Sequence, residues 1–242
     1  MARYILVSGA WHAGWCWERV VPLLEAAGHS ASAPDLLGMG ADPTPVADMT
    51  LARWADQIAD LVRSNAEPAI LVGHSRGGIV ISEVAERVPD HLRMLAYVTA
   101  FLVPSDETLH GTIQRIPRDR EAEPMPLAMA PDGTSTVIGD MVEQVFYNCT
   151  ASDWVDRARS LLTAEPMAVL TTPLALTPER FGSVPRAYVE CLLDNAIPIA
   201  LQRLMQETLP CDPVFTLDTD HSPFYSDPQA LADCLLQLAD SG

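Results

Sequence analysis

The stretch that decides the fold of this chain reads Ala69-Ile70-Leu71-Val72-Gly73-His74-Ser75-Arg76-Gly77-Gly78-Ile79-Val80. Glycines lie two residues before and two residues after Ser75, between an apolar run and a helix-compatible run that begins at Ile79. This spacing is typical of a nucleophile elbow, where small neighbours let a strand and a helix approach around a strained serine. The helix N-terminus favours negative charge that develops there. The stretch predicts Ser75 as a nucleophile, with a purely structural turn as the alternative.

Strands and helices alternate around this elbow at intervals of about 30 residues, as in consecutive βαβ units. Apolar runs predict strands near residues 4–7, 70–72, 94–101, 186–192 and 214–217, and residues 30–34 are expected to form a further strand. Helical periodicity predicts helices near residues 15–27, 50–63, 79–89, 198–209 and 228–238, the second of them capped by Thr50. The pattern predicts an α/β fold with a mostly parallel sheet of about six strands and helices on both faces.

Residues 104–185, called the insertion below, interrupt this alternation. They contain many prolines and no convincing strand, with helical patches near residues 139–148 and 152–163. We expect a helical cap over the carboxyl ends of the strands, where open α/β sheets bind ligands. Residues 1–103 and 186–242 then form the core of one large domain.

Composition excludes several classes of protein. The formal net charge is −17, which argues against nucleic acid and anionic membrane surfaces as partners. All 15 cationic residues are arginine, so no lysine is present for Schiff-base chemistry. The five cysteines include no C-x-x-C pair, the N-terminus does not look like a signal peptide, and no apolar window is long enough to span a membrane. We expect a cytoplasmic enzyme with reduced thiols and no metal site.

A serine nucleophile needs a base and an acid that orients the base, and on this kind of sheet they follow the serine in the order acid, histidine. Of the six histidines, only His221 follows the last predicted strand, which makes it the candidate general base. Asp194 comes directly after the preceding strand and is the candidate acid, with Asp106 as the alternative. His74 is interpreted as structural, and the role of His12 stays open.

The oxyanion hole requires two backbone N–H groups. One is expected from Arg76, the residue after the nucleophile, and the other from Ala10 in the loop after the first strand. Further candidates for the substrate pocket come from this loop, the insertion and the residue after the histidine: Gly9, Trp11, His12, Phe146, Trp154 and Ser222.

Several motifs in order now support a family resemblance. They are Ser8-Gly9-Ala10-Trp11-His12-Ala13-Gly14-Trp15-Cys16-Trp17, the elbow, Glu190-Cys191-Leu192-Leu193-Asp194-Asn195-Ala196-Ile197-Pro198, Asp220-His221-Ser222-Pro223 and Phe146-Tyr147-Asn148-Cys149. The chain resembles, nearly end to end, the branch of the α/β-hydrolase superfamily that contains plant methylesterases, hydroxynitrile lyases and bacterial esterases. The resemblance implies an α/β-hydrolase fold, a Ser-Asp-His triad, no cofactor, and a cap that shapes an apolar pocket for small, often aromatic, esters.

Two positions separate the reactions within this branch. The lyases that resemble this chain carry a threonine where it has Gly9 and a lysine where it has Ser222, so both lyase markers are absent. We therefore predict a bacterial carboxylic ester hydrolase that works through an acyl-enzyme. The alternatives are a hydroxynitrile lyase and a small-ligand receptor on the same fold, and a homodimer stays open. Ser8 replaces the histidine with which the family's first motif usually begins.

Arg76 is unusual, because family members mostly place an apolar or neutral residue after the nucleophile. A cation in the first turn of a helix opposes the helix dipole. Its side chain is therefore expected to have an acidic partner in this chain, with an anionic group of the substrate as the alternative.

Overall fold

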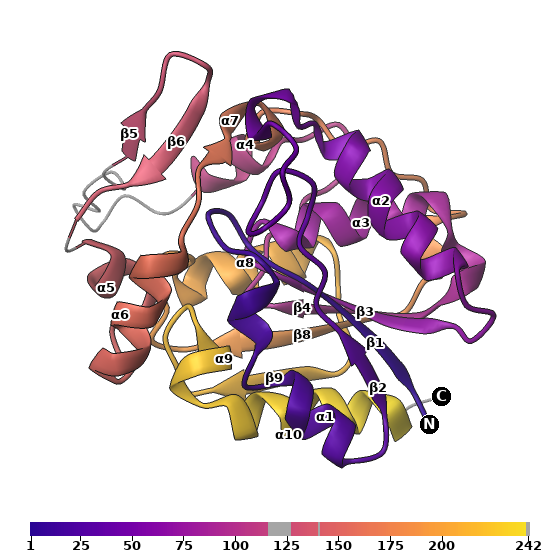
Figure 1. Cartoon of the computed structure of the whole chain (residues 1–242). Coiled ribbons are helices and arrows are strands. Elements are labelled where there is room, and N and C mark those ends of the chain that lie inside the picture. Colours follow the sequence, from indigo (N-terminus) through magenta and orange to yellow (C-terminus); the bar gives the residue numbers. More distant parts are fainter. Residues whose placement is uncertain (116–126, 140, 241–242) are drawn as a thin grey trace.

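The central sheet contains six parallel strands in the order β2-β1-β3-β4-β8-β9 (Figure 1). The computed structural model describes residues 1–115, 127–139 and 141–240. The strands are β1 (Arg3–Val7), β2 (Ser30–Ser32), β3 (Ala69–His74), β4 (Leu92–Val98), β8 (Arg186–Cys191) and β9 (Val214–Leu217). The prediction of a mostly parallel six-stranded sheet is confirmed.

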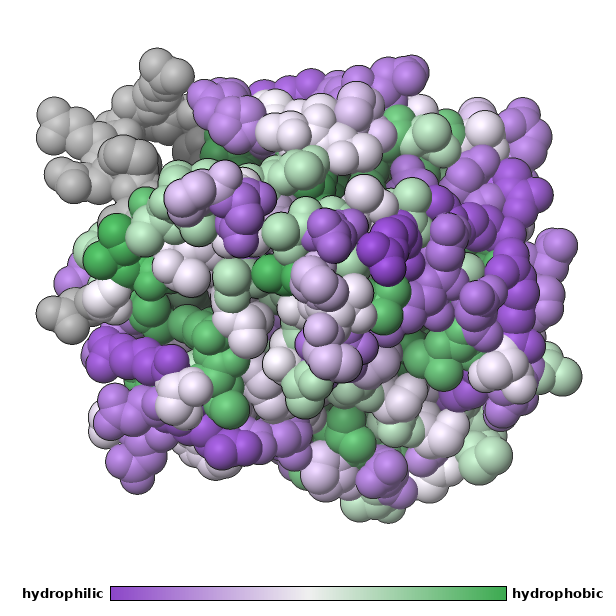
Figure 2. Space-filling view, turned by 45° about the horizontal axis from the view of Figure 1, so that its top comes forward, coloured by the Kyte–Doolittle hydropathy of each residue, from purple (hydrophilic) through white to green (hydrophobic). Residues whose placement is uncertain are grey.

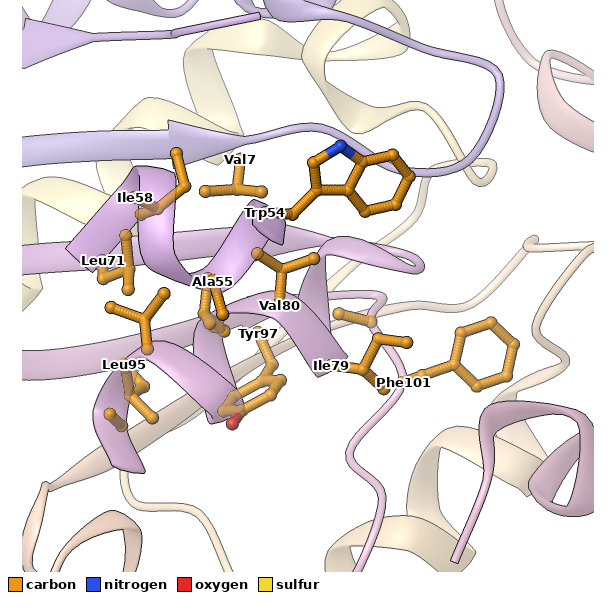
Figure 3. Packing of buried hydrophobic residues seen from close by; sticks show 14 of the residues in the cluster. Val7, Trp54, Ala55, Ile58, Leu71, Ile79, Val80, Leu95, Tyr97 and Phe101 are labelled. Carbon is orange, nitrogen blue, oxygen red and sulfur yellow. The ribbon is translucent and has the colours of Figure 1, made fainter. Parts of the chain in front are cut away.

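Helices cover both faces of this sheet. One face carries α2 (Leu51–Arg63), α3 (Gly77–Arg87) and α8 (Ile199–Thr208), and the other carries α1 (Val21–Ala26) and α10 (Pro228–Asp240) (Figure 1). In Figure 3, Ile58 of α2 and Val80 of α3 pack with Leu71 of the central strand β3. All of β3 is buried, as expected for a parallel strand covered on both sides.

The predicted helices are found with shifted ends. Thr50 caps α2 by accepting a hydrogen bond from the Arg53 amide at 3.2 Å, and α3 already begins at Gly77. The single helix predicted over residues 15–27 is wrong, because this part contains a short 3₁₀ helix, η1 (Gly14–Trp17), and then α1. Pro22 lies in the first turn of α1, where its missing N–H costs nothing, but it could not continue a helix from Trp15.

The insertion contains strands that were not expected. β5 (Leu127–Met129), β6 (Thr134–Val137) and β7 (Glu165–Pro166) form a small antiparallel sheet. These strands have two to four residues, too few to show an alternating pattern. The turn between β5 and β6 did carry a signal in Pro131-Asp132-Gly133, and Gly133 has a positive φ of 83°.

The helices of the insertion agree better with the prediction. α5 (Met141–Phe146) and α6 (Ser152–Leu161) lie in the two expected patches, although residue 140 is outside the described residues. Two short helices, α4 (Leu109–Ile113) and α7 (Met167–Leu170), were not predicted. The remaining short elements are η2 (Val46–Asp48), η3 (Pro89–His91), η4 (Phe181–Ser183) and α9 (Pro223–Ser226). Within the described ranges, no helix is both long and apolar enough to cross a membrane.

The parallel arrangement brings the predicted site residues to one edge of the sheet. Ala10 follows β1, Ser75 follows β3, Asp194 follows β8 and His221 follows β9. Because the carboxyl ends of parallel strands share one edge, these residues are gathered although they are far apart in the sequence.

Candidate active site

Ser75 lies on the turn between β3 and α3 in a left-handed conformation, with φ of 52°. A Cβ at Gly73 would approach the Gly77 carbonyl oxygen to 2.8 Å, and a Cβ at Gly77 would approach the Val7 carbonyl oxygen to 2.8 Å. The glycines therefore allow the close contact of strand, turn and helix that the elbow requires. The Ser75 carbonyl accepts hydrogen bonds from the amides of Gly78 and Phe101, both at 3.0 Å, which hold the turn.

His221 and Asp194 form a buried pair. The His221 Nδ1 donates to Asp194 Oδ2 at 2.7 Å, and both side chains are almost completely buried. The other carboxylate oxygen, Oδ1, accepts hydrogen bonds from the amides of Ala196 at 2.7 Å and Ile197 at 2.8 Å. The Thr99 hydroxyl also donates to Oδ2. With the proton on Nδ1, the neutral ring of His221 keeps Nε2 as a proton acceptor.

His74 contacts both the backbone and the ring of His221. Its Nε2 donates to the backbone carbonyl of His221 at 2.7 Å, and the ring centroids of the two histidines are 4.7 Å apart. Burial lowers the pKa of His74 well below its usual value, with the nearby His221 as a smaller cause. A neutral His74 that holds the loop of His221 agrees with the interpretation of His74 as structural.

The two amides expected to form the oxyanion hole are free. Neither the Ala10 N–H nor the Arg76 N–H has an acceptor among the residues that the structure describes. The loop that carries Ala10 is held at its start by the Ser8 hydroxyl, which donates to the His12 carbonyl at 3.2 Å. Ser8 thus stabilises the loop itself, in the position where the family usually has histidine.

Gly9 leaves no room for a side chain beside Ser75. A Cβ at this position would lie 2.7 Å from the Ser75 Cβ and 2.9 Å from His74 Nδ1. The absent threonine of the lyases could therefore be accommodated here only if the loop or the serine moved.

Gly9→Ala is expected to lower kcat/KM by about 100-fold, because a displacement of about 1 Å at a reacting group costs about that much. Steady-state hydrolysis of a p-nitrophenyl ester measures the effect. Gly182→Ala is the matched control, because its Cβ would meet only ordinary contacts, the nearest at 3.5 Å. Equal activity of Gly9→Ala and wild type would contradict the close contact.

Phe146 of the insertion packs beside His221 and in turn contacts aromatic rings of the loop after β1. The Phe146 ring centroid lies 5.5 Å from that of His221, 5.8 Å from His12 and 5.9 Å from Trp11. Hydrophobic residues border a recess on the same side of the molecule as the insertion (Figure 2). Phe146 thus lies against His221 and Trp11 against Phe146, while their role in a substrate pocket stays a prediction.

Two of the pocket candidates are placed differently. The indole of Trp154 packs on Tyr225, with ring centroids 4.9 Å apart, and under the Arg19 guanidinium at 4.6 Å. The structure does not bring it to the triad, because its position in α6 directs it toward α9. Ser222 adjoins His221 but is completely buried.

His12 stabilises the loop that follows β1 and carries Gly9, Ala10 and Trp11, called the oxyanion loop below. Its Nδ1 lies 2.7 Å from the Ala10 carbonyl, which can only accept, so Nδ1 carries the proton and Nε2 accepts from the Tyr147 hydroxyl at 2.6 Å. Burial lowers the pKa of His12 to about 3, with the nearby His221 and Arg76 as smaller causes. His12 therefore stays neutral and links the loop to the insertion.

This lowered pKa predicts a loss of stability in acid. Between pH 6.5 and about 3 the unfolded chain binds a proton at His12 and the folded chain does not, so the free energy of unfolding falls as the pH falls. The slope contributed by one such group is about 1.4 kcal/mol per pH unit. Urea titrations at several pH values give the free energy of unfolding of wild type and of His12→Gln. Plotted against pH, the two free energies should differ by this slope below pH 6.5 and run parallel above pH 7.5. Parallel curves throughout would contradict a neutral, buried His12.

Arg76 makes an ion pair with Glu165 of β7. Arg76 Nε donates to Glu165 Oε1 at 2.9 Å, and both side chains are buried. The guanidinium also lies over the Trp54 ring, 4.3 Å from its centroid. The expectation of an acidic partner for Arg76 is confirmed.

Sequence reasoning missed Thr99 and Glu165. Thr99 follows β4, the strand beside β8, and its place at a strand end was the available signal. Glu165 lies in a two-residue strand with no pattern of its own. Among the described ranges, no group of histidine, cysteine and acidic side chains could hold a metal ion.

The fold and this arrangement define the class of protein. The chain belongs to the alpha/beta hydrolase family, whose model matches residues 4–234. It is 33% identical over 265 residues to Methylesterase 2 of Arabidopsis thaliana, covering 99% of this chain and 96% of that one. It is 31% identical to the pyrethroid hydrolase of Sphingobium wenxiniae over 249 residues, covering 98% and 87% of the two chains.

A solved structure agrees at the level of the fold. The crystal structure of polyneuridine aldehyde esterase superposes with a TM-score of 0.89 at 24% identity, covering 99% of this chain and all of the other. The α/β-hydrolase fold and the resemblance to the plant methylesterases are thus confirmed. The limits of the insertion and the roles of the site residues stay predictions.

Proposed function

We propose that this protein hydrolyses small, largely apolar or aromatic carboxylic esters, with Ser75 as nucleophile, His221 as base and Asp194 as the acid that orients it. The class of activity, carboxylesterase-type hydrolysis, rests on the similarity to methylesterases and to a pyrethroid hydrolase. The observation that carries the assignment of residues is the buried pair of His221 Nδ1 and Asp194 Oδ2 at the sheet edge where the elbow presents Ser75.

In the first half of the reaction, Ser75 Oγ attacks the ester carbonyl while His221 Nε2 takes the hydroxyl proton. The amides of Ala10 and Arg76 donate to the oxygen that becomes negative in the tetrahedral intermediate. His221 then gives the proton to the departing alcohol, and the acyl group stays on Ser75. In the second half, water attacks the acyl carbon, His221 takes its proton and returns it to Ser75, and the acid leaves.

The aromatic surroundings support an apolar acyl or alcohol group in the substrate. Phe146 lies beside His221 and Trp11 packs against Phe146, and the nearby charge of Arg76 is balanced by Glu165 within the protein. We infer that the insertion acts as a cap, since Phe146 and Glu165 both come from it. The balanced charge favours neutral esters over carboxylate-bearing ones.

The hydroxynitrile lyase alternative is not favoured. The lyases place a lysine after the histidine, where it can hold departing cyanide, and this chain has the buried Ser222 there. The crowded contact between Gly9 and Ser75 also leaves no space for the lyase threonine without rearrangement.

Labelling with a fluorophosphonate, together with turnover of a p-nitrophenyl ester, tests the proposal. An enzyme with this triad is labelled at Ser75 and turns over the ester, whereas a ligand receptor does neither. Release of cyanide from mandelonitrile would instead support the lyase. A panel of esters that varies the acyl and alcohol groups separately then defines the size of the pocket.

We also infer that the protein works in a reducing compartment such as the cytoplasm. All five cysteines are free, and Cys16, Cys191 and Cys234 are buried as thiols. Disulfides are the usual device in oxidising compartments, and none supports this fold. Location in fractionated cells of its source organism tests this inference, and gel filtration tests whether the protein is a homodimer.

A further inference from the structure

The Arg76 side chain holds the oxyanion loop directly at Gly9 and, through Glu165, at Trp11. Its Nη2 donates to the Gly9 carbonyl at 2.9 Å, and its Nε donates to Glu165 Oε1 at 2.9 Å. Glu165 Oε2 accepts a hydrogen bond from the Trp11 amide at 3.2 Å and a longer one from Arg76 Nη2 at 3.4 Å. Ala10, whose amide is expected to bind the oxyanion, is therefore held at the residue before it and at the residue after it.

The contact with Gly9 acts directly on the Ala10 amide. The Gly9 carbonyl and the Ala10 N–H belong to one peptide group, which is planar and trans, so the two bonds point in opposite directions. A hydrogen bond that fixes the direction of the carbonyl thus fixes the direction of the N–H. A positively charged donor on the carbonyl also polarises the peptide group and strengthens the N–H as a donor.

The insertion holds the other side of the loop. Trp11 has a positive φ of 61°, which a residue with a large side chain adopts only when neighbouring contacts hold it. Its amide donates to Glu165, its carbonyl accepts from the Thr163 amide at 2.9 Å, and its indole donates to the Ser135 carbonyl at 3.2 Å. All three partners belong to the insertion, so the loop conformation depends on it.

Burial makes the Arg76–Glu165 pair sensitive to the loss of either partner. Glu165 is completely buried, and burial raises its pKa, while the Arg76 charge and the Trp11 amide oppose this rise. Arg76 Nη1 has no hydrogen-bond partner among the described residues, and the guanidinium lies over the Trp54 ring. Among the described residues, the hydrogen bonds of its side chain go to Glu165 and to Gly9.

We propose that the Arg76 side chain and Glu165 are positioning residues for the oxyanion hole. Arg76 supplies one donor through its own backbone and, with Glu165, orients the other donor at Ala10. This inference rests on the proposed esterase function. It goes beyond the triad because it assigns a catalytic consequence to a residue of the insertion and to a side chain whose hydrogen bonds are made to Glu165 and Gly9.

The test compares Arg76→Met, Glu165→Gln and the double variant, all of which keep the Arg76 amide. We expect kcat for a neutral p-nitrophenyl ester to fall at least tenfold in Arg76→Met and in the double variant, with KM changed less than threefold. Affinity for a trifluoromethyl ketone, which forms the tetrahedral adduct with serine, should fall by the same factor as kcat/KM. If Arg76 and Glu165 only stabilised the fold, kcat/KM and the affinity for the trifluoromethyl ketone would not fall by the same factor.

The double variant separates positioning from folding, because it removes the unpaired buried carboxylate that Arg76→Met would leave. Arg3→Met is the matched control, since Arg3 is also buried and its Nη2 donates to the Val62 carbonyl at 2.7 Å, at the opposite end of β1. Thermal unfolding checks that each variant is folded. If Arg76→Met does not fold, Glu165→Gln is used in its place. We expect wild-type kcat in Arg3→Met.

Recovery of wild-type kcat in the double variant would overturn the inference, because the loss in Arg76→Met would then come from the orphaned Glu165. An unchanged affinity for the trifluoromethyl ketone would overturn it as well. Failure of the esterase function is distinguishable, since wild type would then not hydrolyse the ester, or Ser75→Ala would still do so.

Discussion

Ser75→Ala is expected to lower kcat for a p-nitrophenyl ester by about 10⁴-fold or more, because no other group at the elbow can form the acyl-enzyme. Ser75 has a φ of 52°, and alanine has the same Cβ in the same backbone conformation, so the substitution adds little strain. The loss should therefore appear in kcat and not in the melting temperature. The residual rate would come from the oxyanion amides and from binding alone.

The measurement combines steady-state turnover, fluorophosphonate labelling and thermal unfolding of both proteins. Wild type should show a burst of p-nitrophenol equal to the enzyme concentration if deacylation is slow, and Ser75→Ala should show none. Hydrolysis at the wild-type rate by Ser75→Ala would end the proposed function.

Asp194→Asn is expected to lower kcat by about 10⁴-fold, as loss of the correct histidine tautomer does in serine hydrolases. Asp194 Oδ1 accepts from the amides of Ala196 and Ile197, so an asparagine would place its oxygen there. Its NH₂ group would then face His221 Nδ1 and reverse the hydrogen bond. The proton of a neutral His221 would move to Nε2, which could no longer take the Ser75 proton.

The same assay checks this result, with Asp106→Asn as the matched control. Asp106 is the alternative acid from the sequence, but it is exposed and has a positive φ of 65°, which asparagine tolerates. We expect Asp106→Asn to keep wild-type kcat. Loss of activity in Asp106→Asn together with an active Asp194→Asn would reverse the assignment of the acid.

The core of the fold could be predicted because its signals are local and strong. Most strands of the sheet are apolar runs, β3 among them, and the elbow carries its own spacing of glycines around Ser75. The order of Ser75, Asp194 and His221 could also be predicted, since each follows a strand of a parallel sheet and therefore reaches the same edge. The structure confirms the contact between Asp194 and His221.

The strands of the insertion could not be predicted, because segments of two to four residues have too few positions for a pattern. The break between η1 and α1 was visible only as Pro22, within a run that otherwise has helical spacing. Whether Trp154 faces the pocket or the sheet could not be told from the sequence, and in the structure it packs against Tyr225 and Arg19.

The sequence by itself determined the parallel sheet, the elbow and the order in which Ser75, Asp194 and His221 follow strands of the sheet, because these depend on local spacing and on the rule that strand ends share one edge. The tertiary structure alone decided the partners of the loop, of His12 and of His74. Arg76 could have met any acidic residue of a chain with 32 of them, and only the folding of the insertion onto the core selects Glu165. The physical reason is that a charge must be paired when it is buried, so an acidic partner for Arg76 could be expected from the sequence. The identity of that partner depends on distance in space, which the sequence does not contain.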